Sequence, residues 1–236
     1  MAIRRLLALT VLVVFLGGAF GVSPALADQG TYLPPSSVDL TLILAPPPTP
    51  DSAAGKADLE AVLDAQRNRT PAEAASAQAD AEISVFRFAD AIGPGFKAAN
   101  LPFTTKFFDR VRAAASPVVK TAKAFFKRPR PFVTDPAIKP IIEPPPDLSY
   151  PSGHSTYAYA VAIILANMLP EKAAAIFDRA GIYANNRVIA GVHYPTDIEA
   201  GRISGSIIDN VMLHDALFMA DYAKARIEVR HAVGLQ

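Results

Sequence analysis

Two of the four histidines in this 236-residue chain lie in segments whose residue types could do chemistry. One segment reads Pro-Ser-Gly-His from Pro151 to His154, directly before a helical pattern of apolar residues. Ser152 is a good N-cap residue, and Gly153 lets a ligand approach the free backbone amides of a helix N-terminus. The segment predicts an anion site, although a capped helix start with a half-buried histidine would explain the same residues.

The second histidine, His193, has an arginine six residues before it and a carboxylate four residues after it, which are Arg187 and Asp197. The Tyr194-Pro195 step disfavours helix, so we expect His193 in a turn and Asp197 in the first turn of the next helix. A carboxylate in that place can orient an imidazole and stabilise its cationic form. Alone, the pattern is weak, because a histidine near an aspartate is more often structural, and no further ligands for a zinc site can be assembled.

Four basic residues fall within the eight positions from Lys123 to Arg130. A solvated basic face is the ordinary explanation of such a run. Lys123 and Arg130, however, stand beside aromatic and proline residues that stiffen the backbone, which suits cations that surround a dianion. Together with Arg187, the Ser152 hydroxyl, backbone amides and the two histidines, they suffice for phosphoryl transfer without a metal, and we expect no cofactor.

In this order the three segments resemble the type 2 phosphatidic acid phosphatase superfamily, which also contains the vanadium-dependent haloperoxidases. The shared pattern is K-x6-R-P, then P-S-G-H, then R-x5-H-x3-D. Within the superfamily the chain is most like the bacterial class A nonspecific acid phosphatases, over roughly Tyr32 to Asp215. Arg128 is set aside as the arginine of the first motif, because the residue seven positions before it is Thr121 rather than lysine.

The resemblance implies a mostly helical fold and a secreted nonspecific acid phosphatase that acts on small phosphate monoesters, with phosphotransfer as a further activity. It implies that His193 is the nucleophile of a phosphohistidine intermediate, that Asp197 holds it, and that His154 protonates the leaving alcohol. The residues that it implies for binding phosphoryl oxygens are Lys123, Arg130, Ser152, Gly153 and Arg187. It also implies inhibition by vanadate and a homo-oligomer.

Two residues depart from the family pattern. Asn186 replaces the serine that commonly precedes the arginine of the third motif, and Leu148 replaces a small glycine, so we expect Leu148 to narrow the mouth of the site. Three other functions stay open at this point: a vanadium-dependent haloperoxidase, a soluble lipid phosphate phosphatase, and a binding protein for phosphate without turnover. The pair His154 and His193 favours an enzyme, because a binding protein needs neither a nucleophile nor an acid.

The composition limits the kinds of element that can position these residues. The chain is 51% hydrophobic and 19% charged, has no cysteine, and carries a formal net charge of +1. These values exclude a disordered or disulfide-stapled class, and near-neutrality argues against nucleic-acid binding.

The N-terminal end has the features of a targeting segment. A positive head and an apolar run are followed by small residues at Ala25 and Ala27, which predicts a cleaved signal peptide over 1–27 and a periplasmic or secreted protein. The apolar run is shorter than a membrane span, and we expect no stable membrane insertion. Residues 28–51 form a proline-rich arm in this prediction, and 52–236 form a helical phosphatase domain.

The apolar spacing predicts a compact all-α, bundle-like domain. Helices are expected over 52–67, from 70 to about 92, over 103–126 with an interruption at Ser116-Pro117, and over 155–169, 171–185 and 196–230. A long proline-rich loop over 130–151 separates the third helix from the fourth, and such loops are often functional. His214 and His231 have no supporting pattern, and we interpret them as structural or surface residues.

Overall fold

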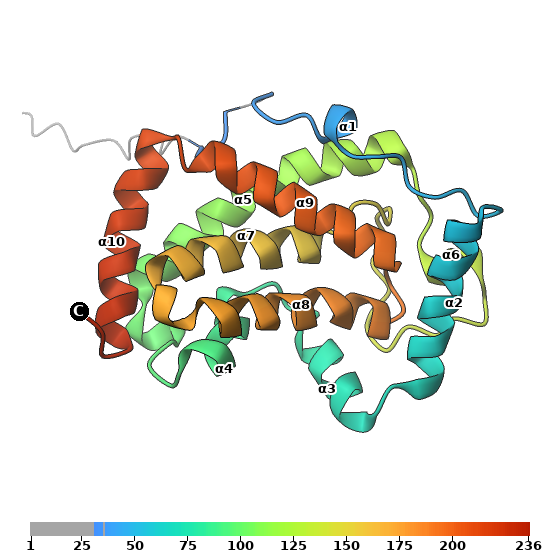
Figure 1. Ribbon diagram of the computed structural model, residues 1–236, viewed down its shortest axis with the longest axis horizontal. Coiled ribbons are helices and arrows are strands. Elements are labelled where there is room, and N and C mark those ends of the chain that lie inside the picture. Colours follow the sequence, from blue (N-terminus) through green and yellow to red (C-terminus); the bar gives the residue numbers. More distant parts are fainter. Residues whose placement is uncertain (1–30, 35) are drawn as a thin grey trace, which may run out of the picture. The chain divides into compact units, whose positions relative to one another are not determined.

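The computed structural model describes residues 31–34 and 36–236, and every regular element in that part of the chain is helical (Figure 1). The predicted signal peptide lies outside the described residues. The prediction of an all-α fold is confirmed. The α-helices are α1 (Leu40–Ile43), α2 (Ala53–Asn68), α3 (Pro71–Ala79), α4 (Ala89–Ile92), α5 (Pro102–Phe126), α6 (Pro131–Thr134), α7 (Gly153–Met168), α8 (Ala173–Ile189), α9 (Pro195–Met212) and α10 (Ala216–Ala232), with short 3-10 turns at Val85–Phe88, Ala98–Asn100 and Pro170–Lys172.

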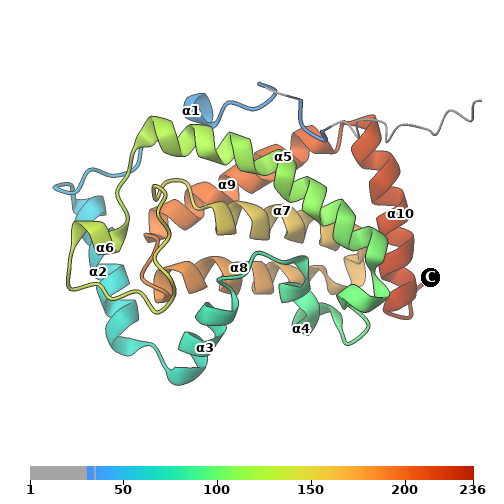
Figure 2. The same ribbon diagram turned by 180° about the vertical axis from the view of Figure 1, so that it is seen from behind.

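Helix α7 is the central element, because its residues are apolar or small on nearly every face and most of them are buried. It lies between α8, α9 and α5 in both the front and the rear view (Figures 1 and 2). Helix α9 approaches α7 closely at Gly201, where an added Cβ would lie 2.6 Å from the carbonyl oxygen of Ser152. The start of α7 and the start of α9 are therefore held directly against each other.

Helix α5 runs unbroken for 25 residues with Pro117 inside it, so the predicted interruption at Ser116-Pro117 is wrong. A proline in a helix interior removes one backbone hydrogen bond. Ser116 donates its hydroxyl to the carbonyl oxygen of Arg112 at 2.8 Å, and the buried face of α5 packs against α1, α7 and α10. The packing of this long amphipathic face offsets the local loss, and the helix ends only where Lys127 adopts a left-handed conformation.

Two predicted helices are each divided. The segment from 70 to about 92 contains α3, a turn and α4, because Asp80 ends α3 and is buried in ion pairs with Arg87 and Arg179. The segment over 196–230 contains α9 and α10, because Asp215 caps a new helix by accepting a hydrogen bond from the amide of Phe218 at 2.8 Å. His214 lies exposed in the turn between them, in keeping with a surface role.

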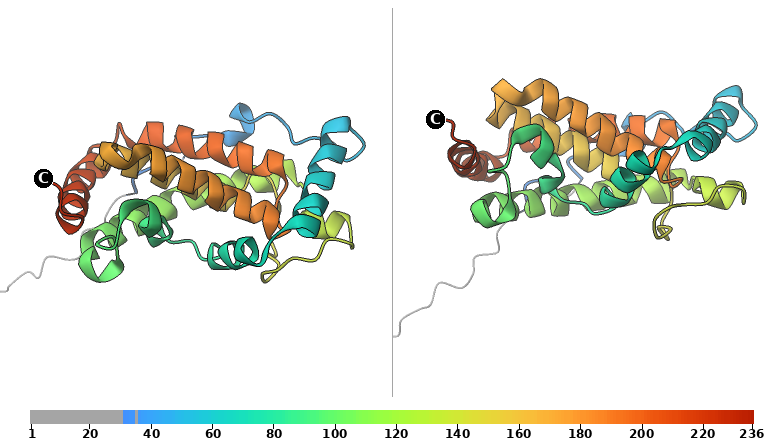
Figure 3. Two further views of the ribbon diagram at one scale, coloured as in Figure 1. Left: turned by 60° about the horizontal axis from the view of Figure 1, so that its bottom comes forward. Right: turned by 90° about the horizontal axis from the view of Figure 1, so that it is seen from below.

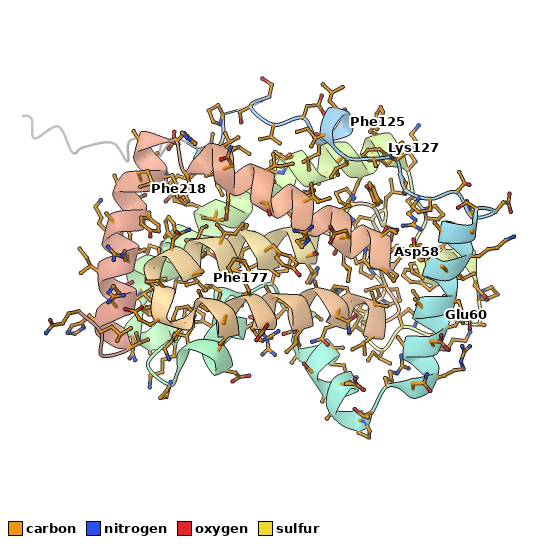
Figure 4. The ribbon with its side chains drawn as sticks, viewed as in Figure 1. Asp58, Glu60, Phe125, Lys127, Phe177 and Phe218 are labelled. Carbon is orange, nitrogen blue, oxygen red and sulfur yellow. The ribbon has the colours of Figure 1, made fainter. Side chains whose placement is uncertain are left out.

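The described part of the N-terminal arm packs onto the helices. Tyr32 is 1% exposed, donates to Asp221 of α10 at 2.8 Å and contacts the rings of Phe107 and Phe218. Phe218 is labelled on α10 in Figure 4. The arm also contains the one-turn helix α1, which contacts α5. Tyr32, Leu33, Leu40 and Leu44 of this arm therefore contribute to the hydrophobic core.

Four helix ends meet at the end of the bundle opposite α10. They are the N-terminal ends of α7 and α9 and the C-terminal ends of α5 and α8, with α2, α3 and α6 beside them (Figure 3). Backbone hydrogen bonds join them, from Ser152 to Asp197 at 3.0 Å and from Ser149 to Arg128 at 2.9 Å. The sequence segments with the candidate chemistry lie at these same helix ends.

No helix within the described residues has both the length and the apolar character that crossing a bilayer requires.

Candidate active site

His193 lies in the turn between α8 and α9, and Asp197 lies in the first turn of α9, as the Tyr194-Pro195 step predicts. The backbone carbonyl of Arg187 accepts hydrogen bonds from the amides of Val192 and His193, which closes the turn. This geometry brings Nδ1 of His193 to 3.2 Å from Oδ2 of Asp197.

Hydrogen bonds determine which nitrogen of His193 carries the proton. The Nε2 atom lies 3.1 Å from Nη1 of Arg130, and because a guanidinium can only donate, Nε2 accepts. The proton of the neutral ring is therefore on Nδ1 and points to Asp197. The carboxylate is held in place, because Oδ2 also accepts from the Ser149 hydroxyl at 2.5 Å and from the Tyr194 amide at 2.9 Å.

The surroundings of His193 favour the neutral ring. Burial lowers the pKa of His193 well below its ordinary value, and the cations of Arg130, Lys123 and Arg187 lower it further. Its Nε2 lone pair is therefore available at mildly acid and neutral pH. A neutral imidazole with an unprotonated nitrogen can act as a nucleophile.

His154 occupies the first turn of α7, and its Nε2 lies 3.0 Å from the carbonyl oxygen of Ala81. A carbonyl can only accept, so Nε2 carries a proton, and Nδ1 is the nitrogen that can exchange one. Burial, followed by the charge of Arg187, lowers the pKa of His154 to about 3. The ring is neutral in the ligand-free protein until a negative charge arrives nearby.

Two cations and a carboxylate lie beside the histidines. Burial and Arg130 lower the pKa of Lys123, in the last turn of α5, to about 8. Arg130 donates to the carbonyl oxygen of Val192 at 2.6 Å. Asp147 forms ion pairs with both, at 3.0 Å from Nζ of Lys123, and although burial opposes the effect, the two cations lower its pKa to about 2.

Arg187 differs from the other cations because its charge is buried without an ion-pair partner in the described part of the chain. It is 1% exposed, and neither Nε nor Nη1 has a hydrogen-bond partner among the described residues. Burial and the charge of Arg130 lower its pKa to about 10, so it remains a cation at neutral pH. Unpaired buried donors are rare in folded proteins, and here they are available for an anion.

A cavity of about 220 Å³ opens among these groups. Five of the eight residues predicted from the sequence line it, and the other three, Ser152, Arg187 and Asp197, are buried and do not line it. Ser152 is the N-cap of α7 and accepts from the Ser155 amide at 3.3 Å. The five lining residues are Lys123, Arg130, Gly153, His154 and His193, and the apolar part of the wall comes from residues such as Val119 and Tyr157.

Sequence reasoning missed Arg128 and Asp58. Arg128 donates to Oδ1 of Asp197 at 2.6 Å and to Oδ2 of Asp58 at 2.7 Å, so the arginine set aside in the motif search contacts the carboxylate that holds His193. The repeated Arg-Pro pair was the available signal in the sequence. Nothing in the sequence indicates Asp58, which lies 70 residues before Arg128 on α2.

The two departures from the family pattern have local explanations. Asn186 donates to Oδ2 of Asp80 at 2.7 Å and to Ser76 at 2.9 Å, next to the Ala81 carbonyl that accepts from His154. Leu148 does not line the cavity that holds the histidines but lines an adjoining depression, which shares Arg130, Pro145 and Asp147 with that cavity. Its backbone carbonyl accepts a hydrogen bond from Lys123.

Across the described part of the chain, no group of three or more histidine, aspartate or glutamate side chains is arranged to hold a metal ion.

Comparisons with known proteins identify the family of the chain. Residues 111–218 match the PAP2 superfamily. The chain is 33% identical to an acid phosphatase of Zymomonas mobilis over 91% of this chain and 86% of that protein. It is 29% identical to a non-specific acid phosphatase of Salmonella typhi over 85% of this chain and 84% of that protein. Among solved structures, a bacterial vanadium-dependent iodoperoxidase shares the fold, with a TM-score of 0.57 and 21% identity over 72% of this chain and 52% of that one.

Proposed function

This chain belongs to the PAP2 superfamily and is an acid phosphatase, and we propose that it hydrolyses small phosphate monoesters through a phosphohistidine intermediate on His193. One observation carries the proposal. A neutral, buried histidine has its Nδ1 held by Asp197 and its Nε2 3.1 Å from Arg130, and it lines a cavity that is surrounded by cations. That is the geometry of an activated nucleophile beside a site for a dianion.

In the first step the Nε2 lone pair of His193 attacks phosphorus, a P–N bond forms, and the bond from phosphorus to the ester oxygen breaks. The leaving oxygen takes a proton from His154. Asp197 stabilises the positive charge that develops on the phosphorylated ring. The cations Lys123, Arg130 and Arg187 stabilise the negative charge on the equatorial oxygens.

In the second step a water molecule attacks phosphorus and the P–N bond breaks. His154, now neutral, takes a proton from the water, and His193 regains its lone pair. The cycle consumes one water and releases an alcohol and phosphate, so atoms and charges balance. An added alcohol in place of water would accept the phosphoryl group, which is the proposed phosphotransfer activity.

The low pKa of His154 in the free protein fits this cycle only if substrate raises it. A phosphate dianion neutralises the charges of Arg187, Arg130 and Lys123, which are part of the cause of the low value. Substrate binding therefore raises the pKa of His154 and favours the protonated form that acts as the general acid. We expect proton uptake on phosphate binding, measured by calorimetry in two buffers of different ionisation enthalpy.

The test compares His193→Ala and His154→Ala with His214→Ala, an exposed histidine far from the cavity, with chelator present throughout. His193→Ala should abolish phosphate release from aryl and alkyl phosphates alike. His154→Ala should reduce turnover much more for an alkyl phosphate than for a nitrophenyl phosphate, because only the alkoxide needs a proton to leave. An active His193→Ala variant, or activity restored by a divalent ion, would contradict the proposal.

The intermediate can be examined directly. Protein quenched in alkali during turnover should carry one phosphoryl group on His193, since the P–N bond survives alkali but not acid. With an added diol, the ratio of phosphodiol to phosphate should rise with diol concentration. Orthovanadate, which resembles the five-coordinate phosphoryl group, should inhibit competitively.

We also propose that the chain is exported and cleaved after Ala27. The support is the positive head, the apolar run and the Ala25-Leu26-Ala27 site. Sequencing of the exported protein should begin at Asp28, and a start elsewhere would contradict this cut.

A further inference from the structure

We propose that Arg128, held by Asp58, is a positioning residue that fixes the carboxylate of Asp197 against His193. The inference rests on the proposed function, because it assigns a purpose to Arg128 only if His193 is the nucleophile. Asp58 lies on α2, outside the segment that matches the superfamily, so a helix of the N-terminal half takes part in the site.

The two oxygens of Asp197 face different partners. Oδ2 faces the site, where it accepts from His193, Ser149 and the Tyr194 amide. Oδ1 faces away from it and accepts from Nη1 of Arg128 at 2.6 Å. A carboxylate held at both oxygens cannot rotate, so the direction of the Nδ1 hydrogen bond of His193 is fixed as well.

Arg128 is itself held on several sides. Its Nη2 donates to Oδ2 of Asp58 at 2.7 Å, its Nη1 also donates to the Thr196 hydroxyl at 2.7 Å, and its guanidinium lies 4.0 Å from the ring centroid of Tyr194. It is 8% exposed and Asp58 is 3% exposed. Figure 4 labels Asp58 on α2 beside the N-terminal end of α9.

The charges form a buried chain that ends at His193. From α2 to the turn before α9, the chain alternates Asp58, Arg128 and Asp197, and His193 follows. Burial lowers the pKa of Arg128, but Asp197 and Asp58 outweigh it and raise that pKa, so the guanidinium stays charged. The three charges sum to −1, and this single negative charge complements the positive charge that His193 gains when it is phosphorylated.

Because the charges of Asp58, Arg128 and Asp197 alternate in sign, removing Arg128 and removing Asp58 should shift the pH profile of activity in opposite directions. His193 also faces Lys123 of α5, Arg130 of the following loop, His154 of α7 and Arg187 of α8, with Asp147 beside Lys123 and Arg130. These groups are unchanged in the variants of Arg128 and Asp58. Removing the charge of Arg128 leaves Asp197 uncompensated, so His193 is protonated at higher pH. Removing the charge of Asp58 does the reverse, with a smaller effect because Asp58 is farther away.

The experiment measures kcat and KM against pH for Arg128→Gln, Arg128→Lys and Asp58→Asn. The matched control is Arg110→Gln, since Arg110 also pairs with an aspartate, Asp221, at 2.5 Å and lies 4.1 Å from a tyrosine ring centroid, at the α10 end of the bundle. We expect kcat to fall about 10- to 100-fold in Arg128→Gln with KM changed less than about threefold. The acid limb of kcat/KM should move up in Arg128→Gln and down in Asp58→Asn.

Arg128→Lys should keep the acid limb near its original position because the charge remains, while kcat recovers only in part because one contact is lost. Should Arg128→Gln fail to fold, the isosteric Asp58→Asn still tests the sign of the shift. If the acid limb moves in neither Arg128→Gln nor Asp58→Asn, and kcat falls no more than in Arg110→Gln, then Arg128 is merely structural and the inference is overturned. Loss of activity in His193→Ala together with that result refutes the role of Arg128 alone, whereas an active His193→Ala refutes the proposed function.

Discussion

Arg187 and Asp209 are both ionisable side chains that have buried polar atoms without hydrogen-bond partners among the described residues, but they lie in two different regions. Arg187 lies near the cavity, with Nε and Nη1 unpaired, and Asp209 lies on α9 twelve residues after Asp197, roughly 18 Å along the helix, with both carboxylate oxygens unpaired among the described residues. Burial lowers the pKa of Arg187 to about 10, and the side chain is still a cation at neutral pH. Burial alone raises the pKa of Asp209 well above its ordinary value, which favours its neutral form.

An unpaired buried group can be accommodated in two ways. A buried charge without a partner is unfavourable, and the protein either supplies a ligand or changes the protonation state. Arg187 stands beside other cations, where a dianion would stabilise it. Among the described residues, no cation affects the pKa of Asp209, and gaining a proton is its remaining route to neutrality. The first case fits the proposed phosphate site, and the second is a local cost in stability.

The largest expected effect is in Arg187→Met, which removes the unpaired cation and keeps an apolar side chain in its place. We expect kcat/KM to fall about 1,000-fold, or about 4 kcal/mol in transition-state stabilisation, while the free energy of unfolding in urea stays equal or rises. The control is Arg202→Met, an exposed arginine on α9 that pairs with Glu199. Loss of stability without loss of activity would show that Arg187 is structural and would end the contrast with Asp209.

Asp209→Asn should act on stability alone. It removes the need to protonate a buried carboxyl, so we expect the free energy of unfolding at pH 7 to rise by about 1–3 kcal/mol with kcat unchanged. Because the folded state binds more protons at this site, the gain should shrink as pH falls toward 4. Asp178→Asn, an exposed acid on α8, is the control. A destabilised Asp209→Asn variant would mean that Asp209 is ionised and paired.

The histidines of the site predict the opposite slope. The folded pKa values of His154 and His193 lie below the unfolded value of about 6.5, so the unfolded state binds more protons below that pH. Stability of the ligand-free protein should therefore fall as pH drops from about 6.5 toward 3, by about 1 kcal/mol per pH unit for His154, with a contribution of the same sign from His193. Urea unfolding between pH 4 and 7 measures this slope. The slope should be smaller in His154→Asn and also in the presence of saturating phosphate. An unchanged slope in both experiments would contradict the burial of the two histidines as neutral rings.

How much the sequence could predict follows from how local each feature is. The pairing of His193 with Asp197 spans four residues around one proline, and the N-cap at Ser152 spans three, so spacing and turn chemistry sufficed. The pair of Arg128 and Asp58 spans 70 residues and depends on how α2 packs beside α9. No local pattern encodes such a contact.

The fold shows the same limit. The all-α class and the main helices follow from apolar spacing, but the continuity of α5 through Pro117 depends on its packing against three other helices. The end of α3 at Asp80 depends on Arg179, 99 residues later. Tertiary contacts decided these points against local propensity.

The smallest expected effect concerns Asp147, whose carboxylate pairs with Lys123 and Arg130, two of the cations proposed to bind phosphate. Its side chain is 53% exposed, so it can move into solvent when an anion arrives, and such pairs contribute little. Asp147→Asn removes this internal competitor, and the inhibition constant of phosphate should fall about two- to fivefold with little change in kcat. Glu143→Gln, an exposed acid of the same loop, is the matched control, because it makes the same change in net charge without a contact to either cation. Equal tightening in both variants would indicate a general charge effect, and weaker inhibition in Asp147→Asn would indicate that Asp147 holds the two cations in position for the phosphate.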